Sequence, residues 1–528
     1  MKIKNIIIGA LLLLPTAASA QITSPITRAM INVYDEILRE NPREYEVLLR
    51  RGNEYYNHNL YHKAIEDVNN ALRYIPADDK DTRFRALILR ANTYNLAKRY
   101  PDALKDLNEA LTISPGNYVV LYLRANTEYN LGQYDPAKLD YSAMLRQNPR
   151  SQDAMFGLAK IAVKQSNLGL ANDWSNKAVD LSPALSDVYI RRAEVRELAG
   201  NVQGAVNDYI LTISTDTENT PRALQELVRL SGTNYATVMA GLSDAIQKSP
   251  RTGMFYYIRA KIAQSHCHYR DAIADYDKII NEKLYSYGGL NASLAECYFD
   301  LCDFESAILN VDYAINSAKD NAEYYVLKSK IQRAMGQADQ ALASAETALE
   351  KNPNLNSGLQ AKALAQISLE QYQDASVNLS EAVLNDPTDP YLLMLRGWVL
   401  TDFRKQEKTA RTVYEQVLDL NFDLDDVRSL RGFALLYLGR DKEAIAWFDD
   451  VLKDGVDSDG MKNYYAACFY AQKGDLDKAF AHAEKSLENG YANRYNWTLN
   501  NDARINVAPL RGDARFKALM EKYAHIFK

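Results

Sequence analysis

A step of 34 residues recurs along most of this chain of 528 residues, and it limits the folds that the chain can adopt. Proline follows the step from Pro42 to Pro76, and again through Pro115, Pro149 and Pro183. Alanine follows it in two series, which are Ala103, Ala137, Ala171 and Ala205, and then Ala307, Ala341 and Ala375. A period of this length indicates an array of small units that stack on their neighbours, because one such unit cannot bury its apolar face alone.

Each unit is predicted to be a pair of helices joined by a tight turn. The pattern is clearest in residues 45–78, 84–117 and 118–151, where apolar residues fall at three- and four-residue intervals. These units share a small residue at position 8, an aromatic residue at position 17, alanine at position 20 and proline at position 32. The small residues let the two helices approach closely, and the proline ends the second helix, where its missing N–H group does least harm.

This pattern resembles the tetratricopeptide repeat. The resemblance implies an all-α fold, an α-solenoid with the form of a right-handed superhelix, built from about twelve tetratricopeptide helix-turn-helix repeats. The division that follows is an N-terminal array over residues 24–219, a degenerate repeat or bend over 220–252, a C-terminal array over 253–491 and a capping segment over 492–528. The amphipathic helix of that last segment is expected to cover the apolar face of the last repeat, since an array needs closed ends.

Residues 1–20 have the pattern of a secretory signal peptide. Lys2 and Lys4 precede the apolar stretch Ile6–Leu14, and the small residues of Ala18–Ala20 precede a cleavage site. The apolar stretch is too short to span a bilayer of about 30 Å, so no membrane insertion of the mature chain is expected. We therefore expect an exported protein in the periplasm, with a secreted or envelope-associated location left open.

Position 7 of the repeat is often arginine in this chain, and position 23 of the same repeats is then aspartate. Where position 7 is leucine, position 23 is not acidic, as in Leu158 with Trp174 and Leu294 with Asn310, whereas Arg431 with Trp447 breaks the rule. Because the two positions change together, we predict ion pairs that join the two helices of a repeat, and a ladder of arginines for anionic ligands is the alternative. The predicted pairs are Arg51 with Asp67, Arg90 with Asp106, Arg124 with Asp140, Arg192 with Asp208, and Arg259 with Asp275.

The sequence contains no persuasive catalytic arrangement, so no enzyme activity, cofactor or metal is predicted. It has neither a Gly-rich phosphate loop before a helix nor the His-Glu-x-x-His and Gly-x-Ser-x-Gly motifs. The cluster His266-Cys267-His268 invites a soft-metal interpretation, but it lacks the spaced cysteine pairs of a structural zinc site, and turn residues are the favoured interpretation. Cys267, Cys297 and Cys302 are left open between one disulfide and buried thiols.

The resemblance also implies that the first helices of successive repeats line a concave groove, with positions 2, 5, 9 and 12 facing it. Asparagine there offers a hydrogen-bond donor and an acceptor, and tyrosine offers flat contact area with a polar tip. We expect Asn92→Ala combined with Asn126→Ala to weaken partner capture and leave the melting temperature nearly unchanged. The candidate groove residues of the N-terminal array are Asn53, Tyr56, Asn92, Asn95, Tyr122, Asn126 and Tyr129.

Together these features predict a non-enzymatic protein–protein interaction scaffold in the bacterial cell envelope, which binds a protein or an extended peptide in the groove. A net charge of −6 without a basic block argues against nucleic acid as a partner. The alternative is a carbohydrate-binding protein of the glycan-capture type, although the lipoprotein cysteine and long grafted loops of that type are missing. A lumenal co-chaperone of the eukaryotic secretory pathway is a third interpretation, and it lacks the His-Pro-Asp signature. The oligomeric state stays open, as does the question whether both arrays bind.

Overall fold

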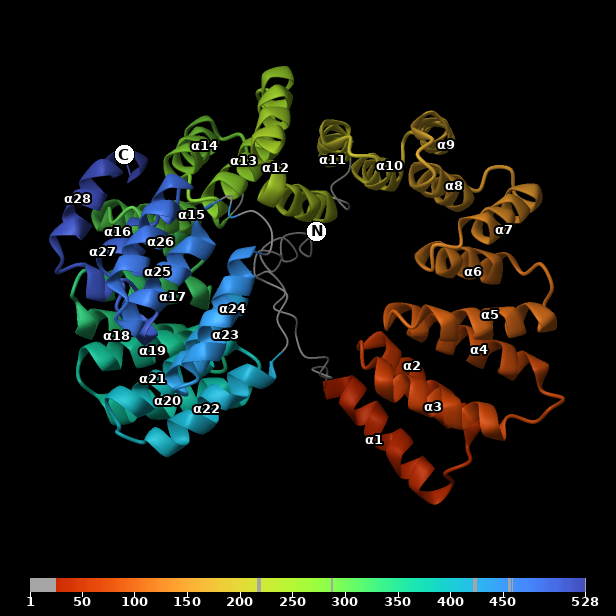
Figure 1. Cartoon of the computed structure of the whole chain (residues 1–528), viewed down its shortest axis with the longest axis horizontal. Coiled ribbons are helices and arrows are strands. Elements are labelled where there is room, and N and C mark those ends of the chain that lie inside the picture. Colours follow the sequence, from red (N-terminus) through yellow and green to blue (C-terminus); the bar gives the residue numbers. More distant parts are fainter. Residues whose placement is uncertain are drawn as a thin grey trace. The chain divides into compact units, whose positions relative to one another are not determined.

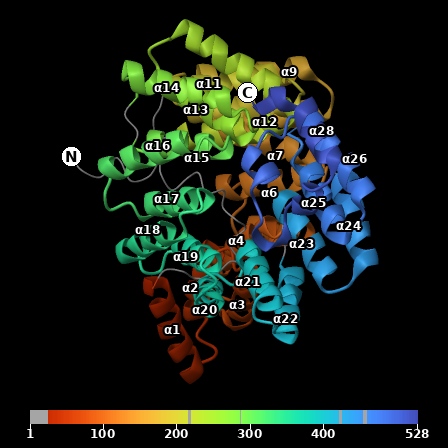
Figure 2. The same ribbon diagram turned by 90° about the vertical axis from the view of Figure 1, so that its left-hand side faces the viewer.

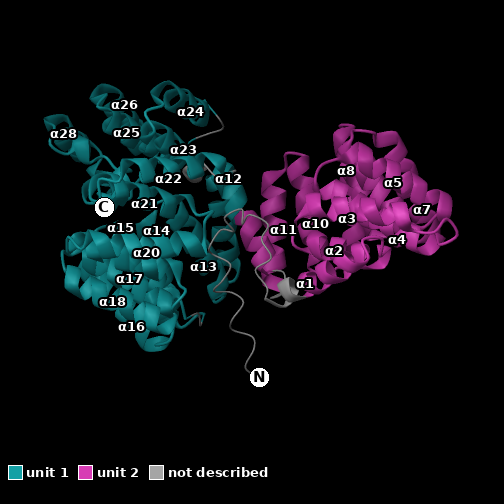
Figure 3. Cartoon of the chain, turned by 90° about the horizontal axis from the view of Figure 1, so that it is seen from below, with its two compact units in different colours: residues 1–17, 228–528 teal, residues 18–227 magenta. Residues whose placement is uncertain are grey.

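The computed structural model describes residues 25–215, 220–285, 288–420, 425–453, 457 and 459–527, and the predicted signal peptide over residues 1–20 lies outside them. All regular elements in the described part are α-helices or short 3-10 helices. They form two compact units, which we call the N-terminal and the C-terminal unit, and the division falls inside helix α12 (Thr220–Lys248), after Leu227 (Figure 3). The domain boundaries drawn from the sequence remain predictions.

The N-terminal unit begins with one unpaired helix and continues with five helix pairs along a curved row (Figure 1). The first helix of the second pair begins at Lys80, about one turn before residue 84, where the sequence pattern starts the repeat. The Asp79 side chain accepts a hydrogen bond from the Thr82 amide and caps the helix at this earlier position. The helices are α1 (Pro25–Glu40), α2 (Tyr45–Asn57), α3 (Tyr61–Tyr74), α4 (Lys80–Leu96), α5 (Tyr100–Ile113), α6 (Tyr118–Asn130), α7 (Tyr134–Gln147), α8 (Gln152–Lys164), α9 (Leu168–Asp180), α10 (Asp187–Leu198) and α11 (Val202–Thr215).

The C-terminal unit holds seven further pairs, and in Figure 2 the helices from α13 to α20 follow one another down the unit. Before them, the degenerate repeat forms α12, which is kinked at Asn234, where φ is −134°. The pairs are α13 (Gly253–Ser265) and α14 (Tyr269–Glu282), α15 (Leu290–Asp300) and α16 (Phe304–Ser317), α17 (Ala322–Ala334) and α18 (Ala338–Lys351), α19 (Asn356–Ser368) and α20 (Tyr372–Asn385), α21 (Pro390–Asp402) and α22 (Glu407–Asp419), α23 (Asp425–Tyr437) and α24 (Asp441–Lys453), and α25 (Met461–Lys473) and α26 (Leu476–Glu488).

The twelve helix pairs of the described residues confirm the predicted all-α solenoid of tetratricopeptide-type units. In each pair, one residue of the turn between the helices has a positive φ, which costs an ordinary L-residue about 1 kcal/mol. Glycine takes this place in five pairs, at Gly132, Gly200, Gly336, Gly439 and Gly474. In the other seven pairs, the turn residues are Asn59, Lys98, Ser166, Cys267, Cys302, Glu370 and Lys405.

Small residues set the distance between the helices of a pair, as the sequence pattern requires. A Cβ atom on Gly432 would lie 2.3 Å from the ring of Phe448, so α23 and α24 can pack only with glycine there. The alanines at position 20 are fully buried in the same way, as at Ala64, Ala103 and Ala137.

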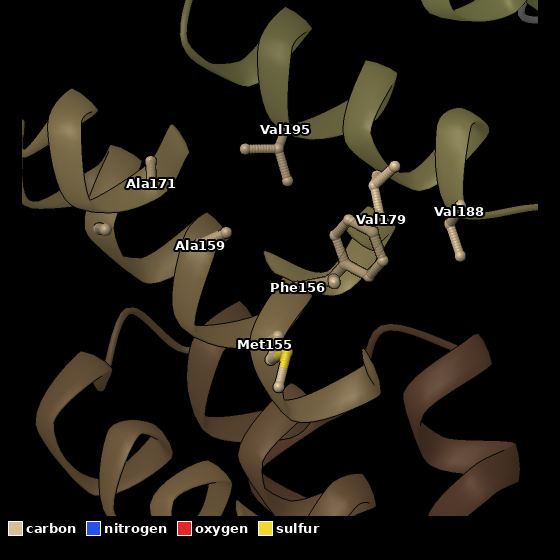
Figure 4. Close-up of a cluster of buried hydrophobic side chains, with 9 residues drawn as sticks. Met155, Phe156, Ala159, Ala171, Val179, Val188 and Val195 are labelled. Carbon is tan, nitrogen blue, oxygen red and sulfur yellow. The ribbon is translucent and has the colours of Figure 1, made fainter. Parts of the chain in front are cut away.

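The core is shared between neighbouring repeats rather than enclosed within one. Figure 4 shows Met155, Phe156 and Ala159 of α8 in one cluster with residues of α9 and of α10, the first helix of the next repeat. The members from these two helices are Ala171, Ala178, Val179, Val188 and Val195. Each repeat therefore depends on its neighbour for burial, which is how a solenoid gains stability.

After α26 the chain forms α27 (Arg494–Thr498), η1 (Asp502–Arg504), η2 (Ala508–Leu510), α28 (Ala514–Lys522) and η3 (Ala524–Phe527). Helix α28 lies along α26, where Arg515 pairs with Asp477 at 2.7 Å and Lys522 pairs with Glu484 at 2.6 Å. The last repeat is thus covered by the end of the tail. The part of the tail before η2 contacts α25 of the last repeat through Trp497 and Tyr464, and it also packs against the earlier helices α15 and α21.

Candidate functional site

The five arginines at position 7 each clamp the aspartate sixteen residues later. In Arg51 the Nε atom donates to Asp67 Oδ2 at 2.8 Å and Nη2 donates to Oδ1 at 2.6 Å. The same two-bond geometry recurs, at 2.7–2.9 Å, in Arg90 with Asp106, Arg124 with Asp140, Arg192 with Asp208, and Arg259 with Asp275. The aspartates are buried, and the hydrogen bond to Asp67 raises the pKa of the Arg51 guanidinium. These arginines are therefore engaged inside the array.

Each of these guanidinium groups also reaches the preceding repeat, a contact that the sequence interpretation missed. The remaining Nη1 atom donates to a polar residue on the helix before it, at position 25 of the preceding repeat in four cases and at position 24 of the degenerate repeat in the fifth. The acceptors are Asp35 at 2.5 Å, Asn69 at 2.6 Å, Asn108 at 2.9 Å, Asn176 at 3.1 Å and Ser243 at 2.9 Å. The repeated polar residue at this position was the available signal. One arginine thus ties together three helices.

The repeats that lack the Arg–Asp pair use other chemistry at the same place. The Arg431 guanidinium lies 4.8 Å from the ring centre of Trp447, so its partner at position 23 is an aromatic face. Lys328 forms an ion pair with Asp312 at 2.8 Å, and Lys362 forms one with Glu346 at 3.1 Å. In each case the acidic residue lies on the second helix of the preceding repeat. Arg396 is the exception, because its buried Nε atom has no hydrogen-bond partner among the described residues.

We call the seven groove candidates of α2, α4 and α6 the first-helix face. Asn53 is exposed, the other six residues are half-buried, and the side chains of Asn53 and Asn92 make no hydrogen bond with another described residue. Tyr122 and Tyr129 pack against the buried cluster around Tyr141, and burial raises the pKa of Tyr129 to about 12. The face therefore combines two amide side chains without hydrogen-bond partners among the described residues with two tyrosines whose rings pack against the core.

Two asparagines of this face already have partners within the array. Asn126 Oδ1 accepts a hydrogen bond from the hydroxyl of the buried Tyr141 at 2.7 Å, and Asn95 Oδ1 accepts one from Thr127 at 3.0 Å. Removal of the Asn126 amide would leave a buried hydroxyl unpaired, at a cost of about 1–3 kcal/mol. We therefore expect Asn126→Ala to lower the melting temperature, which makes Asn53 with Asn92 the cleaner pair.

The corresponding face of the C-terminal unit is covered by the chain itself. Residues 492–504, which we call the return segment, leave the last repeat and lie against α15 and α21. Asn493 donates to Asp300 at 3.1 Å, the Tyr495 ring lies 4.4 Å from that of Phe299, and Asp502 binds Arg333 through bonds of 2.6 and 3.0 Å. The sequence interpretation assigned residues 492–528 to a capping segment. In the structure the return segment contacts α25 of the last repeat, where the Trp497 ring lies 5.0 Å from that of Tyr464, and it also reaches these earlier repeats.

The return segment is part of the core. Trp497 and Ala503 are fully buried, and the Trp497 indole donates to the Tyr491 carbonyl at 3.0 Å. Arg511 also binds the main chain of the segment. Its Nε atom donates to the Trp497 carbonyl at 2.9 Å and its Nη2 atom donates to the Asn500 carbonyl at 2.7 Å. A partner peptide cannot use this face without unfolding a buried part of the unit.

The cluster His266-Cys267-His268 is the turn between α13 and α14. Cys267 has the positive φ of that turn, His266 contacts the Ser231 hydroxyl at 2.9 Å, and Tyr235 stacks on the His268 ring at 4.9 Å. All four cysteines are free thiols, and Cys267, Cys297 and Cys468 are buried. Within the described ranges, no group of three or more His, Cys, Asp or Glu side chains is placed to hold a metal ion.

Comparison with known families identifies the repeat. The sequence model of the tetratricopeptide repeat family matches residues 49–118 and 122–186, and a second model of that family matches residues 322–355. The chain is a tetratricopeptide repeat protein. Repeats of this family support a role as a protein-interaction scaffold, and the fold is typically non-catalytic. No curated protein matches the sequence of this tetratricopeptide repeat protein.

Solved structures similar to this tetratricopeptide repeat protein include three repeat proteins of low identity. Yeast Tom70 is 16% identical, with 76% of this chain and 97% of that chain covered and a TM-score of 0.38. A tetratricopeptide repeat protein from Parabacteroides merdae is 17% identical, with 61% and 98% covered and a TM-score of 0.28. YrrB, described as having an unusual peptide-binding site, is 16% identical, with 37% and 96% covered and a TM-score of 0.26.

No helix among the described residues has both the length and the apolar character needed to cross a bilayer.

Proposed function

We propose that this protein is an interaction scaffold of the bacterial cell envelope, which binds an extended segment of a partner protein on the first-helix face of its N-terminal unit. The observation that carries the proposal is the contrast between the two units. The first-helix face keeps the Asn53 and Asn92 amides free of partners among the described residues, whereas the return segment already fills the equivalent face of the C-terminal unit.

The chemistry of the face suits a peptide main chain. Each free amide offers a donor and an acceptor, which can pair with a peptide N–H and C=O group. Tyr122 and Tyr129 add contact area that costs little side-chain entropy, because both rings are already packed against the Tyr141 cluster. A stacked array of this kind is rigid before binding, so little free energy is lost in ordering the site.

Location in the periplasm is part of the same proposal and is supported by the sequence pattern of residues 1–20. Osmotic-shock fractionation and the intact mass of the purified protein test it. A periplasmic protein that begins at Gln21 supports the proposal, and a cytoplasmic protein that retains Met1 contradicts it.

The binding proposal is tested by site-specific photo-crosslinking in cells at native expression. A crosslinker in place of Asn92 is expected to yield one abundant partner, and a crosslinker at the exposed Asn172 of α9 is expected to yield none. Asn53→Ala with Asn92→Ala should reduce capture of that partner at least tenfold with an unchanged melting temperature, while Asn172→Ala leaves capture intact. Equal crosslinking from both positions, or full capture by the double variant, would refute the assignment.

A further inference from the structure

The return segment leaves a cavity of about 430 Å³ inside the C-terminal unit, between itself and the first helices α17, α19 and α21. Lys330 and Arg333 of α17, Gln360 of α19 and Tyr391 of α21 lie on one side, and the asparagines of the return segment lie on the other. This volume falls within the range of about 300–1,000 Å³ that is usual for small-ligand sites. The cavity is separate from the first-helix face of the N-terminal unit.

Several polar groups of the cavity wall have no protein partner within the described part of the chain. The Gln360 amide and the Tyr391 hydroxyl make no hydrogen bond with any described residue, although both residues are half-buried. Asp300 also lines the cavity and accepts a hydrogen bond from Asn493 at 3.1 Å, and burial raises the pKa of Asp300 to about 6. An amide, a phenol and a carboxylate together offer both donors and acceptors to a ligand.

The charges of the cavity wall cancel within the wall. Asp502 neutralises Arg333 through a two-bond pair, and Arg333 also donates to the Tyr495 hydroxyl at 3.4 Å. Lys330 attracts the Asp300 carboxylate, and its Nζ atom lies 4.3 Å from the centre of the Phe299 ring. A ligand without net charge leaves the Arg333–Asp502 pair and the contact of Lys330 with Phe299 in place.

From these features we propose that the cavity binds a neutral saccharide of one or two rings. Sugar hydroxyl groups each donate and accept, which matches the mixture left open by Gln360, Tyr391 and Asp300. The aromatic carbons of Tyr391 and Tyr495, together with Leu364, supply the apolar contact that the C–H faces of a sugar ring need. A longer polysaccharide does not fit, because the return segment closes the cavity on one side.

The test is calorimetric titration of the full-length mature protein with a panel of neutral mono- and disaccharides, and with glycine and diglycine as zwitterionic ligands of similar size. We expect a saccharide to bind and Tyr391→Phe to weaken it about tenfold, which corresponds to about 1.4 kcal/mol for one lost hydrogen bond. Gln360→Ala should have a similar effect. The matched control is Tyr313→Phe on the outer surface of α16, where the tyrosine is 53% exposed, and it should leave the dissociation constant unchanged.

Three outcomes would overturn the proposal. They are the absence of binding across the panel at millimolar concentration, tighter binding of the zwitterions than of any saccharide, and saccharide affinity that both cavity variants retain. Thermal melts of Tyr391→Phe and Gln360→Ala accompany the titration, and one folded variant is enough to decide the outcome. Because the peptide proposal is tested through Asn53 and Asn92, each of the two proposals can fail without the other.

Discussion

The two units of this protein are built from the same repeat but use it differently. In the N-terminal unit, four of the five repeats carry the Arg–Asp clamp, and within this unit the described helices contact only close neighbours in sequence. Among the described residues of the C-terminal unit only Arg259 keeps the clamp, and the strongest new links join residues far apart. Asp502 binds Arg333 from 169 residues away, and Asn493 reaches Asp300 from 193.

This contrast shows how an array gains or loses a binding face. Short-range clamps stabilise each repeat from behind and leave the first-helix face to a partner. In the C-terminal unit, long-range contacts of the return segment stabilise the unit, and the same segment covers the face of the first helices. In covering this face, the return segment leaves a small polar cavity beneath it.

The strongest effect should follow from breaking the long-range link. Asp502→Ala leaves the Arg333 guanidinium buried without a counter-charge and should destabilise the C-terminal unit by about 3–5 kcal/mol. Chemical denaturation followed by tryptophan fluorescence measures this, because Trp398, Trp447 and Trp497 report on that unit and Trp174 reports on the other.

The control for this measurement is Lys522→Ala, which removes one partner of an exposed ion pair with Glu484 and should have only a small effect on stability. Equal losses in the two variants would mean that the return segment is not integral to the unit, and the contrast between the two units would then fail.

A smaller effect is expected from breaking one short-range clamp. Asp106→Ala strands the Arg90 guanidinium and should lower the stability of the N-terminal unit by about 3 kcal/mol, measured by the same denaturation through Trp174. The double variant Arg90→Met with Asp106→Leu should recover most of the loss, because no buried charge remains.

Arg431→Met removes only a cation–π contact and should cost about 1 kcal/mol or less. A loss of the same size in Arg431→Met would erase the distinction between the clamp and its aromatic substitute.

The weakest effect is a pH dependence in the N-terminal unit. Glu128 is buried, one of its carboxylate oxygens has no partner among the described residues, and burial together with the nearby Asp140 raises its pKa from 4.5 to about 7 despite Arg124. Between these pH values the folded state holds a proton that the unfolded state has lost, so this group lowers stability as the pH rises from 4.5 to 7.

Glu128→Gln should therefore raise the free energy of unfolding by about 1–2 kcal/mol at pH 8 and change it little at pH 4. Denaturation curves at the two pH values check this. A gain that is equal at both values would show that packing, and not ionisation, is responsible.

The sequence predicted the parts of the fold that depend on near neighbours. The small residues at positions 8 and 20 and the paired change of positions 7 and 23 revealed the helix pairs and the Arg–Asp contacts, because all of these partners lie within one repeat. The sequence did not reveal that Asn126 supports the Tyr141 hydroxyl, since an asparagine at a groove position has the same pattern whether it faces a ligand or the protein. It predicted that Cys267 lies in a turn but left open whether this cysteine forms a disulfide, and in the structure Cys267 is a free thiol.

The path of the chain after the last repeat emerged only from the folded molecule. A periodic sequence specifies how each repeat sits on the next, and contacts between neighbours repeat with the period. The course of residues 492–504 depends instead on the rotation accumulated over five or six repeats, which brings Asp502 to Arg333 and Asn493 to Asp300. No local pattern records that sum, because a small change in the angle between any two repeats would move the partners apart. The repeat and its clamps can thus be read from the sequence, whereas the face that remains open to a partner is set by the packing of the whole C-terminal unit.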